Sequence, residues 1–428
     1  MSVINFFHQL TAIPRCSKNH KPFIDFITNF ATDRGYETFV DDANNILCKK
    51  ENSKAKVCLQ SHYDIVCLDD NATPPIIIER DGYLYAQNST LGADNGIGCA
   101  MMMACMDSGL DLEYLFTSDE EIGLLGANDI DFELNSTYMI NLDSECENEI
   151  CIGCAGGVDI KGTISKKDII PNDGYILYEI SVSGLDGGHS GVDIDKNIPN
   201  AIKLLSRTLK ESNCLVLDIN GGERINSIPK NVTAIVASKD KIISKDSFTT
   251  INKLSTEAKH LTILSPKIVD FLYSFANGIR EYDKNLQSVI TSINLALIKT
   301  DFEKVTVELS ARSMDNDKLE LITNETALLL ENFGFSSSTN GKYPAWNPQT
   351  NELSDILLEA YKKEFPNPKL YAIHAGLECS ILKHKYPNIK IASLGPNIHL
   401  PHSYNERVEL ASIEKIFKIL KDVLMGIA

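Results

Sequence analysis

Three apolar runs in the first third of the chain lead directly into side chains that can bind metals or move protons. Residues 57–59 lead into His62, residues 112–116 into a pair of glutamates, and residues 138–142 into an aspartate. Helical spacing alternates with these runs, which is typical of a sheet covered by helices. Open α/β sheets place their sites beyond the strand ends, so the runs predict both a fold class and the position of a site.

The middle of the chain has a different pattern. A strand at 175–183, a glycine-rich turn and a helix at 199–209 are followed later by a second strand-turn-helix unit at 304–330. A chain of 428 residues is also too long for one hydrophobic core. We therefore predict an α/β catalytic domain with a mixed, mainly parallel sheet, and an inserted α+β lid domain built from two strand-turn-helix halves. The predicted bounds are 1–157 and 347–428 for the catalytic domain and 158–346 for the lid.

Composition excludes several classes of protein. A formal charge of −17 disfavours nucleic acid as a partner, and the apolar runs are shorter than the roughly 20 residues of a membrane span. The N-terminus lacks the basic start and cleavage site of a signal peptide, which predicts a cytoplasmic protein. We accordingly expect the eleven cysteines to be reduced thiols. Cys151 and Cys154 form one C-x-x-C, but the flanking isoleucines favour a strand over a structural zinc site.

His62 and Asp64 alternate at the end of a predicted strand, so their side chains share a face and Asp64 can accept the second imidazole N–H. Ordinary surface chemistry is the alternative reading of this short motif. Asp94 lies between Gly92 and Gly96, where little side-chain bulk obstructs the approach of a ligand or metal. An ordinary Asx turn is the alternative there.

Glu120 and Glu121 point in different directions on any regular backbone, so one can bind a metal while the other faces an attacking water. A surface charge pair is the alternative. Asp143 is the first carboxylate after its apolar run, and the loop near the C-terminus offers His399 and His402. Hydrolysis assisted by two metals needs ions roughly 3.5–4 Å apart that share a water and polarise the scissile carbonyl.

These residues carry a resemblance to a known family. The chain resembles the aminoacylase and carboxypeptidase family of co-catalytic zinc peptidases, and within it the aminoacyl-histidine dipeptidase branch, over nearly its whole length. Eight motifs occur in the same order: Ile-Pro-Arg-Cys-Ser at 13–17, Gln-Ser-His-Tyr-Asp at 60–64, Thr-Leu-Gly-Ala-Asp-Asn-Gly at 90–96, Asp-Glu-Glu at 119–121, Asn-Leu-Asp-Ser-Glu at 141–145, Ile-Gly-Cys-Ala-Gly-Gly at 152–157, Gly-Gly-His-Ser-Gly at 187–191 and His-Ala-Gly-Leu-Glu-Cys at 374–379.

The resemblance implies a role for each matching residue. It implies metal ligands at His62, Asp94, Glu121, Asp143 and His402, with Asp94 bridging two ions. His402 is preferred to His399 because the family's ligand precedes a serine and, a few residues on, a glutamate. The implied catalytic residues are Glu120 as general base, Asp64 as the residue that orients His62, and His189 as a donor to the oxyanion. The implied substrate contacts are Asn226, Arg312, His374, Gly376 and Glu378.

The implied function is hydrolysis of unblocked dipeptides, including those of the β-alanyl-histidine type. The implied cofactors are two divalent ions per chain, zinc first, with manganese or cobalt as substitutes. A deacylase of N-acyl amino acids remains open on the same fold, as does a catalytically silent metal-binding or interaction protein. We expect a homodimer, in which His189 acts within its own chain or in the partner's site.

Overall fold

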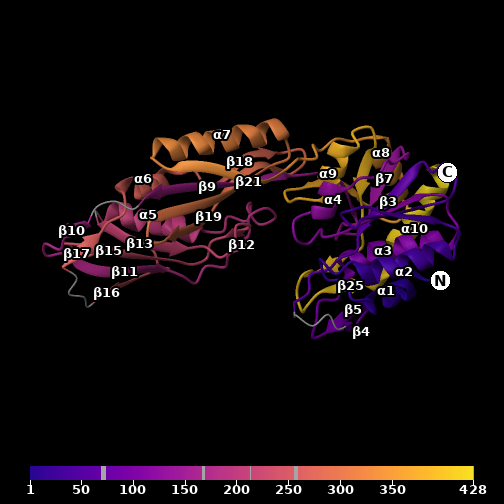
Figure 1. The fold of residues 1–428 in the computed structure, drawn as a ribbon, viewed down its shortest axis with the longest axis horizontal. Coiled ribbons are helices and arrows are strands. Elements are labelled where there is room, and N and C mark those ends of the chain that lie inside the picture. Colours follow the sequence, from indigo (N-terminus) through magenta and orange to yellow (C-terminus); the bar gives the residue numbers. More distant parts are fainter. Residues whose placement is uncertain (69–73, 166–168, 213, 255–258, 428) are drawn as a thin grey trace. The chain divides into compact units, whose positions relative to one another are not determined.

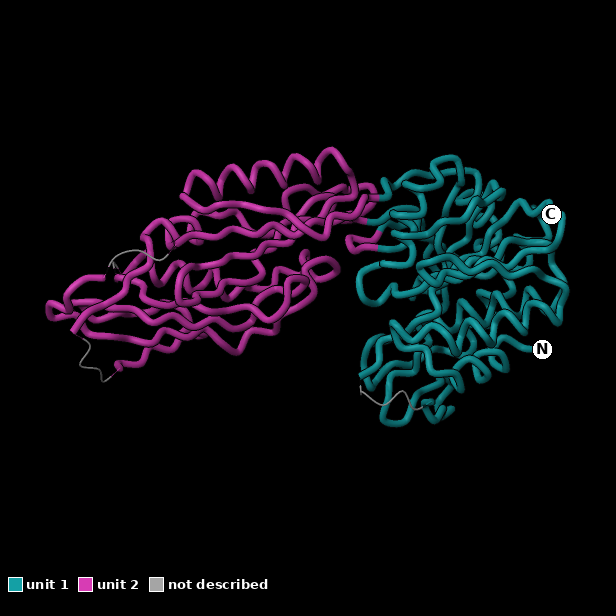
Figure 2. Tube along the Cα trace, in the orientation of Figure 1, with its two compact units in different colours: residues 1–154, 346–372, 377–428 teal, residues 155–345, 373–376 magenta. Residues whose placement is uncertain are grey.

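The computed structural model describes residues 1–68, 74–165, 169–212, 214–254 and 259–427. The chain divides into two compact units (Figure 2). Unit 1 comprises Met1–Cys154, Trp346–Ala372 and Leu377–Ala428, and unit 2 comprises Ala155–Ala345 and Ile373–Gly376. The short segment 373–376, which carries His374 and Gly376, therefore belongs to unit 2 although the chain on either side of it lies in unit 1. Within the described helices, none combines the length and apolar content that crossing a membrane requires.

Unit 1 is an α/β structure with helices packed around its strands (Figure 1). Its main sheet has eight strands in the order β1-β2-β6-β3-β7-β23-β8-β22. A second, four-stranded sheet has the order β24-β25-β5-β4. The elements of unit 1 are α1 (Val3–Thr11), α2 (Lys21–Thr32), β1 (Glu37–Val40), β2 (Ile46–Lys49), β3 (Val57–His62), β4 (Ile76–Arg80), β5 (Tyr83–Gln87), α3 (Ala93–Asp107), β6 (Glu113–Thr117), α4 (Leu125–Asp129), β7 (Tyr138–Asn141), β8 (Glu149–Cys154), α8 (Glu352–Tyr361), β22 (Lys369–Ile373), α9 (Glu378–Lys385), β23 (Lys390–Ser393), β24 (Ile398–His399), β25 (Arg407–Glu409) and α10 (Leu410–Ile427).

The central strands β6, β3, β7 and β23 run parallel, and the outer strands β1, β2 and β8 pair antiparallel. The predicted mixed sheet flanked by helices is confirmed. All five residues of β6 and all six of β3 are buried, because helices cover the sheet and leave no polar face. Helix α3 packs against β3 and is buried along nearly its whole length, as its run of small and apolar residues predicts.

Unit 2 is built on a nine-stranded sheet of order β16-β11-β15-β13-β19-β20-β9-β21, with β18 paired to β19. The two predicted strand-turn-helix units correspond to β11 followed by α5 and to β20 followed by α7. The elements of unit 2 are β9 (Gly156–Ser165), β10 (Ile169–Pro171), β11 (Ile176–Val182), β12 (Gly188–His189), α5 (Ala201–Glu211), β13 (Leu215–Gly221), β14 (Ser227–Ile228), β15 (Val232–Ser238), β16 (Thr249–Lys253), β17 (His260–Thr262), α6 (Pro266–Ser274), β18 (Gly278–Asp283), β19 (Ser288–Thr300), β20 (Lys304–Ser313), α7 (Asn316–Asn332) and β21 (Ser336–Tyr343).

The expectation that all cysteines are free thiols is wrong for one pair, because Cys16 and Cys67 form a disulfide with Cα atoms 5.6 Å apart. Cys16 lies in a parallel bridge with Ile65, which brings the N-terminal segment beside the loop that follows β3. The two cysteines are 51 residues apart in the sequence. Composition and spacing could not predict that the chain returns to this point.

Candidate active site

The predicted ligands come from strand ends that meet at one edge of the unit 1 sheet. His62 is the last residue of β3, Glu121 follows β6, and Asp143 follows β7. Since β6, β3 and β7 are adjacent and parallel, their carboxyl ends lie side by side. Asp94 joins them from the first turn of α3 and His402 from the loop between β24 and β25.

The ring of His62 is fixed so that one nitrogen is free to bind a metal. Nδ1 lies 3.0 Å from the backbone carbonyl oxygen of Asp64, which can only accept, so Nδ1 carries the proton. Nε2 faces Asp94 Oδ1 at 3.1 Å and Asp143 Oδ1 at 3.4 Å, and is the ring nitrogen left for a metal. A backbone carbonyl on the second nitrogen is a common way to orient a ligating histidine.

Asp94 turns its two carboxylate oxygens towards two different imidazoles. Oδ1 faces His62, and Oδ2 lies 3.1 Å from Nε2 of His402. The same His402 nitrogen lies 3.0 Å from Glu121 Oε2. Asp94 therefore belongs to two groups of ligand atoms whose members lie within 4.8 Å of one another, one with His62 and Asp143 and the other with Glu121 and His402. One carboxylate shared by two such groups is what a bridging ligand requires.

The charge of the site favours a bound cation. Burial, together with the Asp94 and Glu121 carboxylates, raises the pKa of Asp143 to about 6, although His62 opposes the shift. Burial and the Asp94 carboxylate likewise raise the pKa of Glu121, against His402 and His62. Glu121 Oε1 is buried and has no hydrogen-bond partner among the described residues. Buried carboxylates in such number are normally paired or bound to metals, so this donor set fits divalent ions.

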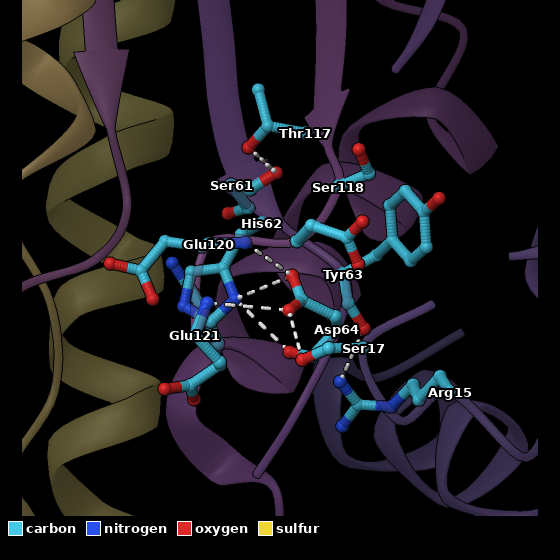
Figure 3. A network of polar contacts seen from close by, with 12 residues as sticks. Arg15, Ser17, Ser61, His62, Tyr63, Asp64, Thr117, Ser118, Glu120 and Glu121 are labelled. Carbon is cyan, nitrogen blue, oxygen red and sulfur yellow. Dashed lines mark hydrogen bonds and ion pairs between the residues drawn. The ribbon is translucent and has the colours of Figure 1, made fainter. Parts of the chain in front are cut away.

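Asp64 holds the turn that carries the two glutamates (Figure 3). Its Oδ1 accepts from the Glu120 amide at 3.0 Å, and its Oδ2 accepts from the Glu121 amide at 3.3 Å and from Ser17 Oγ at 2.8 Å. The nearest approach of this carboxylate to His62 Nδ1 is 3.6 Å, longer than the distance from the Asp64 carbonyl. The carboxylate is therefore engaged mainly with the backbone of the catalytic turn, and the carbonyl is closer to the imidazole.

Glu120 lies in a third group of potential ligands with His62 and Glu121. Burial raises the pKa of Glu120 well above its usual value, and the Glu121 and Asp143 carboxylates add to the shift, although His62 opposes it. A carboxylate with a raised pKa is a stronger base near neutral pH. Its place beside His62 and Glu121 and its raised pKa together suit Glu120 to take a proton in this site.

The structure separates the two C-terminal histidines. His402, with a left-handed backbone (φ 59°), reaches Asp94 and Glu121. His399 lies in β24, opposite Arg407, and its ring lies beside Tyr83 with centroids 5.9 Å apart. Only His402 of this pair belongs to a group of ligand atoms in the described chain.

Two buried residues of opposite charge clamp the turn before Asp94, and neither was assigned a role from the sequence. Arg15 donates to the carbonyl oxygens of Tyr63 at 2.8 Å and Gly92 at 2.6 Å. Glu406 accepts from Thr90 Oγ1 and from three successive amides, those of Gly92 (2.9 Å), Ala93 (2.8 Å) and Asp94 (3.2 Å). Glu406 therefore ties the His402 loop to the Asp94 turn.

The glycines around Asp94 make room for Arg15. A Cβ at Gly92 would lie 2.9 Å from Arg15 Nη2, and one at Gly96 would lie 2.4 Å from the same atom. Gly92 also has a left-handed backbone (φ 65°), which a side chain would strain. From the sequence, we explain Gly92 and Gly96 by access for a ligand or metal. The structure adds that both positions must lack a side chain to make room for Arg15.

In unit 2, His189 is held as a neutral ring with a hydrogen-bond donor. The amides of Gly191 and Val192 both donate to Nδ1 at 3.2 Å, which leaves the ring proton on Nε2. Burial and the nearby positive charge of Arg312 lower the pKa of His189 to about 4. At neutral pH His189 therefore presents an uncharged Nε2–H.

Arg312 is buried in β20, where Nη1 donates to the Tyr343 hydroxyl at 2.9 Å and Nε has no hydrogen-bond partner within the described chain. Ser292, opposite Arg312 in the sheet, lies 2.7 Å from Nε2 of His374. Burial and Arg312 lower the pKa of His374 to about 3. The remaining candidates in unit 2 are Asn226, which is exposed and whose carbonyl accepts from Ser190 at 2.8 Å, and Gly376, where a Cβ would lie 2.9 Å from the Tyr343 ring.

Glu378, predicted as a substrate contact, is fully buried at the first position of α9. Its Oε2 accepts from Gln60 Nε2 at 2.6 Å and from Thr117 Oγ1 at 2.7 Å. Burial raises the pKa of Glu378 to about 7, with His62 opposing the shift. No helix was predicted from the sequence over Glu378–Lys385.

Comparison with known proteins gives a family match over most of the chain. A sequence model of Peptidase family M20/M25/M40 matches residues 58–426. The chain is 31% identical to a cytosol non-specific dipeptidase of Escherichia coli (strain K12), over 99% of this chain and 97% of the relative.

Solved structures with a similar fold cover 99% of the chain. An aminoacylhistidine dipeptidase from Vibrio alginolyticus matches with a TM-score of 0.84 and 27% identity, over 99% of this chain and 96% of the other. The aminopeptidase PepT from Bacillus cereus matches with a TM-score of 0.59 and 16% identity, over 99% of this chain and 97% of the other, and supports the fold alone.

Proposed function

The chain belongs to peptidase family M20/M25/M40 and is a metallopeptidase, and from this premise we propose that it hydrolyses the peptide bond of unblocked dipeptides with two divalent ions. The observation that carries the proposal is Asp94, whose two oxygens face two different histidines, each with its own further carboxylate. The names of the similar proteins, a non-specific dipeptidase and an aminoacylhistidine dipeptidase, support dipeptides, including Xaa-His types, as substrates.

We assign His62 and Asp143 to one ion, Glu121 and His402 to the other, and Asp94 to both. Imidazole and carboxylate donors suit zinc, and manganese or cobalt would fit the same set. When bound, the two ions would polarise the scissile carbonyl and lower the pKa of a water between them.

Glu120 is the proposed general base. Its carboxylate takes a proton from the attacking water and passes it to the departing amide nitrogen, so that the amine leaves uncharged. Asp64 supports this step because it holds the Glu120 and Glu121 amides, which fixes the direction of each side chain. Glu121 then remains a ligand while Glu120 moves the proton.

Unit 2 supplies the proposed substrate contacts. His189 would donate its Nε2–H to the developing oxyanion, a role that its neutral state and fixed tautomer support. Arg312 would bind the substrate carboxylate, since the buried guanidinium has an Nε–H without a partner in the described chain. Asn226, His374 and Gly376 are proposed as further contacts.

A panel of free, N-acylated and C-amidated dipeptides, with metal analysis of the purified protein, tests the proposal. Two ions per chain and preferential cleavage of free dipeptides are expected. Preferential cleavage of N-acylated substrates would favour the deacylase, and bound metal without hydrolysis would favour the silent binding protein.

We also propose a cytoplasmic homodimer. The name of the Escherichia coli relative, cytosol non-specific dipeptidase, supports the cytoplasmic location. Sedimentation tests the dimer, and mixing His189→Ala with Glu120→Gln chains tests the origin of the histidine. Activity restored by mixing would place His189 in the partner's site, and no restoration would place it in its own chain.

A further inference from the structure

We propose that Glu378 is a positioning residue for Asp143 and that it acts through Gln60 and Asn141. The inference rests on the proposed function, in which Asp143 and His62 hold one of two ions. It assigns Glu378 a place beneath the metal site and not in contact with the substrate.

Three neighbouring strands bring polar side chains to one face of the sheet just before the site. Gln60 lies opposite Asn141 of β7, and His62 lies opposite Thr117 of β6. Gln60 and His62 are two residues apart in β3, so their side chains point to the same face of the sheet. Thr117, Gln60 and Asn141 are fully buried, so water cannot supply hydrogen bonds to their side chains.

These side chains form a directed chain of hydrogen bonds that begins at Glu378. The Glu378 carboxylate accepts from Gln60 Nε2 at 2.6 Å. Gln60 Oε1 accepts from Asn141 Nδ2 at 2.6 Å. Asn141 Oδ1 accepts from the backbone amide of Asp143 at 3.2 Å. The chain thus runs from α9 across two strands to a metal ligand.

Both ends of the chain fix the direction of its bonds, because the Glu378 carboxylate accepts and the Asp143 amide can only donate. An ionised carboxylate only accepts, so Gln60 must turn Nε2 towards Glu378 and Oε1 towards Asn141. Asn141 must then turn Nδ2 towards Gln60, and its Oδ1 remains for the Asp143 amide. Without an acceptor at position 378, Gln60 Nε2 keeps only Thr117 Oγ1, at 3.0 Å, among its described acceptors, and the chain loses the charged group at its α9 end.

Thr117 is also tied to this carboxylate, at 2.7 Å, and it is the last residue before the turn that carries the catalytic glutamates. Glu378 therefore joins the ends of β6 and β3 directly and that of β7 through Gln60. Its other oxygen, Oε1, is buried and has no hydrogen-bond partner in the part of the chain that the structure describes.

Glu378→Ala removes the acceptor, and we expect the zinc ion held by His62 and Asp143 to bind about 10–100-fold more weakly, the usual effect of losing a group that supports a ligand. The second ion, held by Glu121 and His402, should bind nearly as in the wild type. Glu378→Gln should restore tight binding, because a glutamine can turn its oxygen to the same two donors.

The experiment is a zinc titration of the metal-free full-length chain against a chromophoric chelator. Glu113→Ala is the matched control, because Glu113 is also buried and accepts from the Asn135 amide and from the amide and hydroxyl of Ser136, but at the opposite end of β6. This control should lower thermal stability and leave both zinc affinities unchanged. Gln60→Leu interrupts the chain one step later and should weaken the same single ion, even if Glu378→Ala fails to fold.

A second readout separates positioning from general damage. The double variant Glu378→Ala with Gln60→Leu should lose no more zinc affinity than either single variant, because both interrupt one chain. Unchanged affinity for both ions in Glu378→Ala or Gln60→Leu would overturn the inference, as would an equal loss in Glu113→Ala. A wild-type chain that binds no zinc would instead overturn the proposed function, and this inference with it.

Discussion

Glu406→Gln tests whether one buried carboxylate shapes the turn that carries Asp94. The carboxylate is 2% exposed and accepts four hydrogen bonds, with Gly92 and Thr90 on one oxygen and Ala93 and Asp94 on the other. A glutamine keeps one oxygen and replaces the other by an amide group. In the favoured arrangement the glutamine oxygen accepts from the Ala93 and Asp94 amides. The glutamine NH₂ group then faces the Gly92 amide, which is also a donor.

The magnitude follows from these contacts. A buried amide without an acceptor costs about 1–3 kcal/mol. The two retained hydrogen bonds change from a charged to a neutral acceptor, which is roughly half as strong and costs about 1 kcal/mol each. The total of about 3–5 kcal/mol corresponds to a fall in Tm of roughly 6–20 °C for a unit of this size.

Calorimetry of the metal-free chain measures the fall in Tm, and a zinc titration measures the effect on both ions. Both should bind more weakly, because Asp94 contributes to each. Glu409→Gln is the control, since its carboxylate accepts a single described bond, from Asn397 Nδ2 at 2.8 Å, which a glutamine can keep. A Tm within about 2 °C of the wild type together with unchanged zinc affinity would refute the reasoning.

Three other predictions concern individual residues. Glu120→Gln should keep both metals and lower kcat by about 10²–10⁴-fold, because the proton acceptor is lost while the shape is kept; steady-state kinetics with metal analysis measures this, and near-normal kcat would remove Glu120 from the role. His402→Ala should reduce metal content towards one ion per chain while His399→Ala leaves two, and elemental analysis showing the reverse would reassign the ligand. The folded-state pKa of His189, about 4 against an ordinary 6.5, means that the unfolded chain binds more protons between these values. The contribution of His189 to stability is therefore present above about pH 6.5 and is lost as the pH falls towards 4. Tm measured against pH should fall less steeply in this window for His189→Gln, and parallel curves would contradict the lowered pKa of His189.

The sequence predicts those parts of the site that depend on local pattern. His62, Glu121 and Asp143 each follow an apolar run that predicts a buried strand. Because these strands are parallel and adjacent, their ends bring the three side chains to one edge of the sheet. His402 needed the resemblance to a family, because its loop has no periodic pattern. The pairs Arg15–Gly92 and Glu406–Gly92 join residues 77 and 314 positions apart, and no local signal marks them.

This division has a physical cause. A ligand is recognised by its chemistry, and carboxylates or imidazoles after a buried strand are unusual enough to be noticed. A positioning residue is recognised only by the donor or acceptor that it meets, and Glu378 meets Gln60 across 318 positions. The sequence places Glu378 next to a substrate motif and so suggests a contact with the substrate, whereas burial and two inward hydrogen bonds give its carboxylate a different partner. Substitutions that separate zinc affinity from substrate affinity therefore test the part of the site that sequence pattern alone cannot assign.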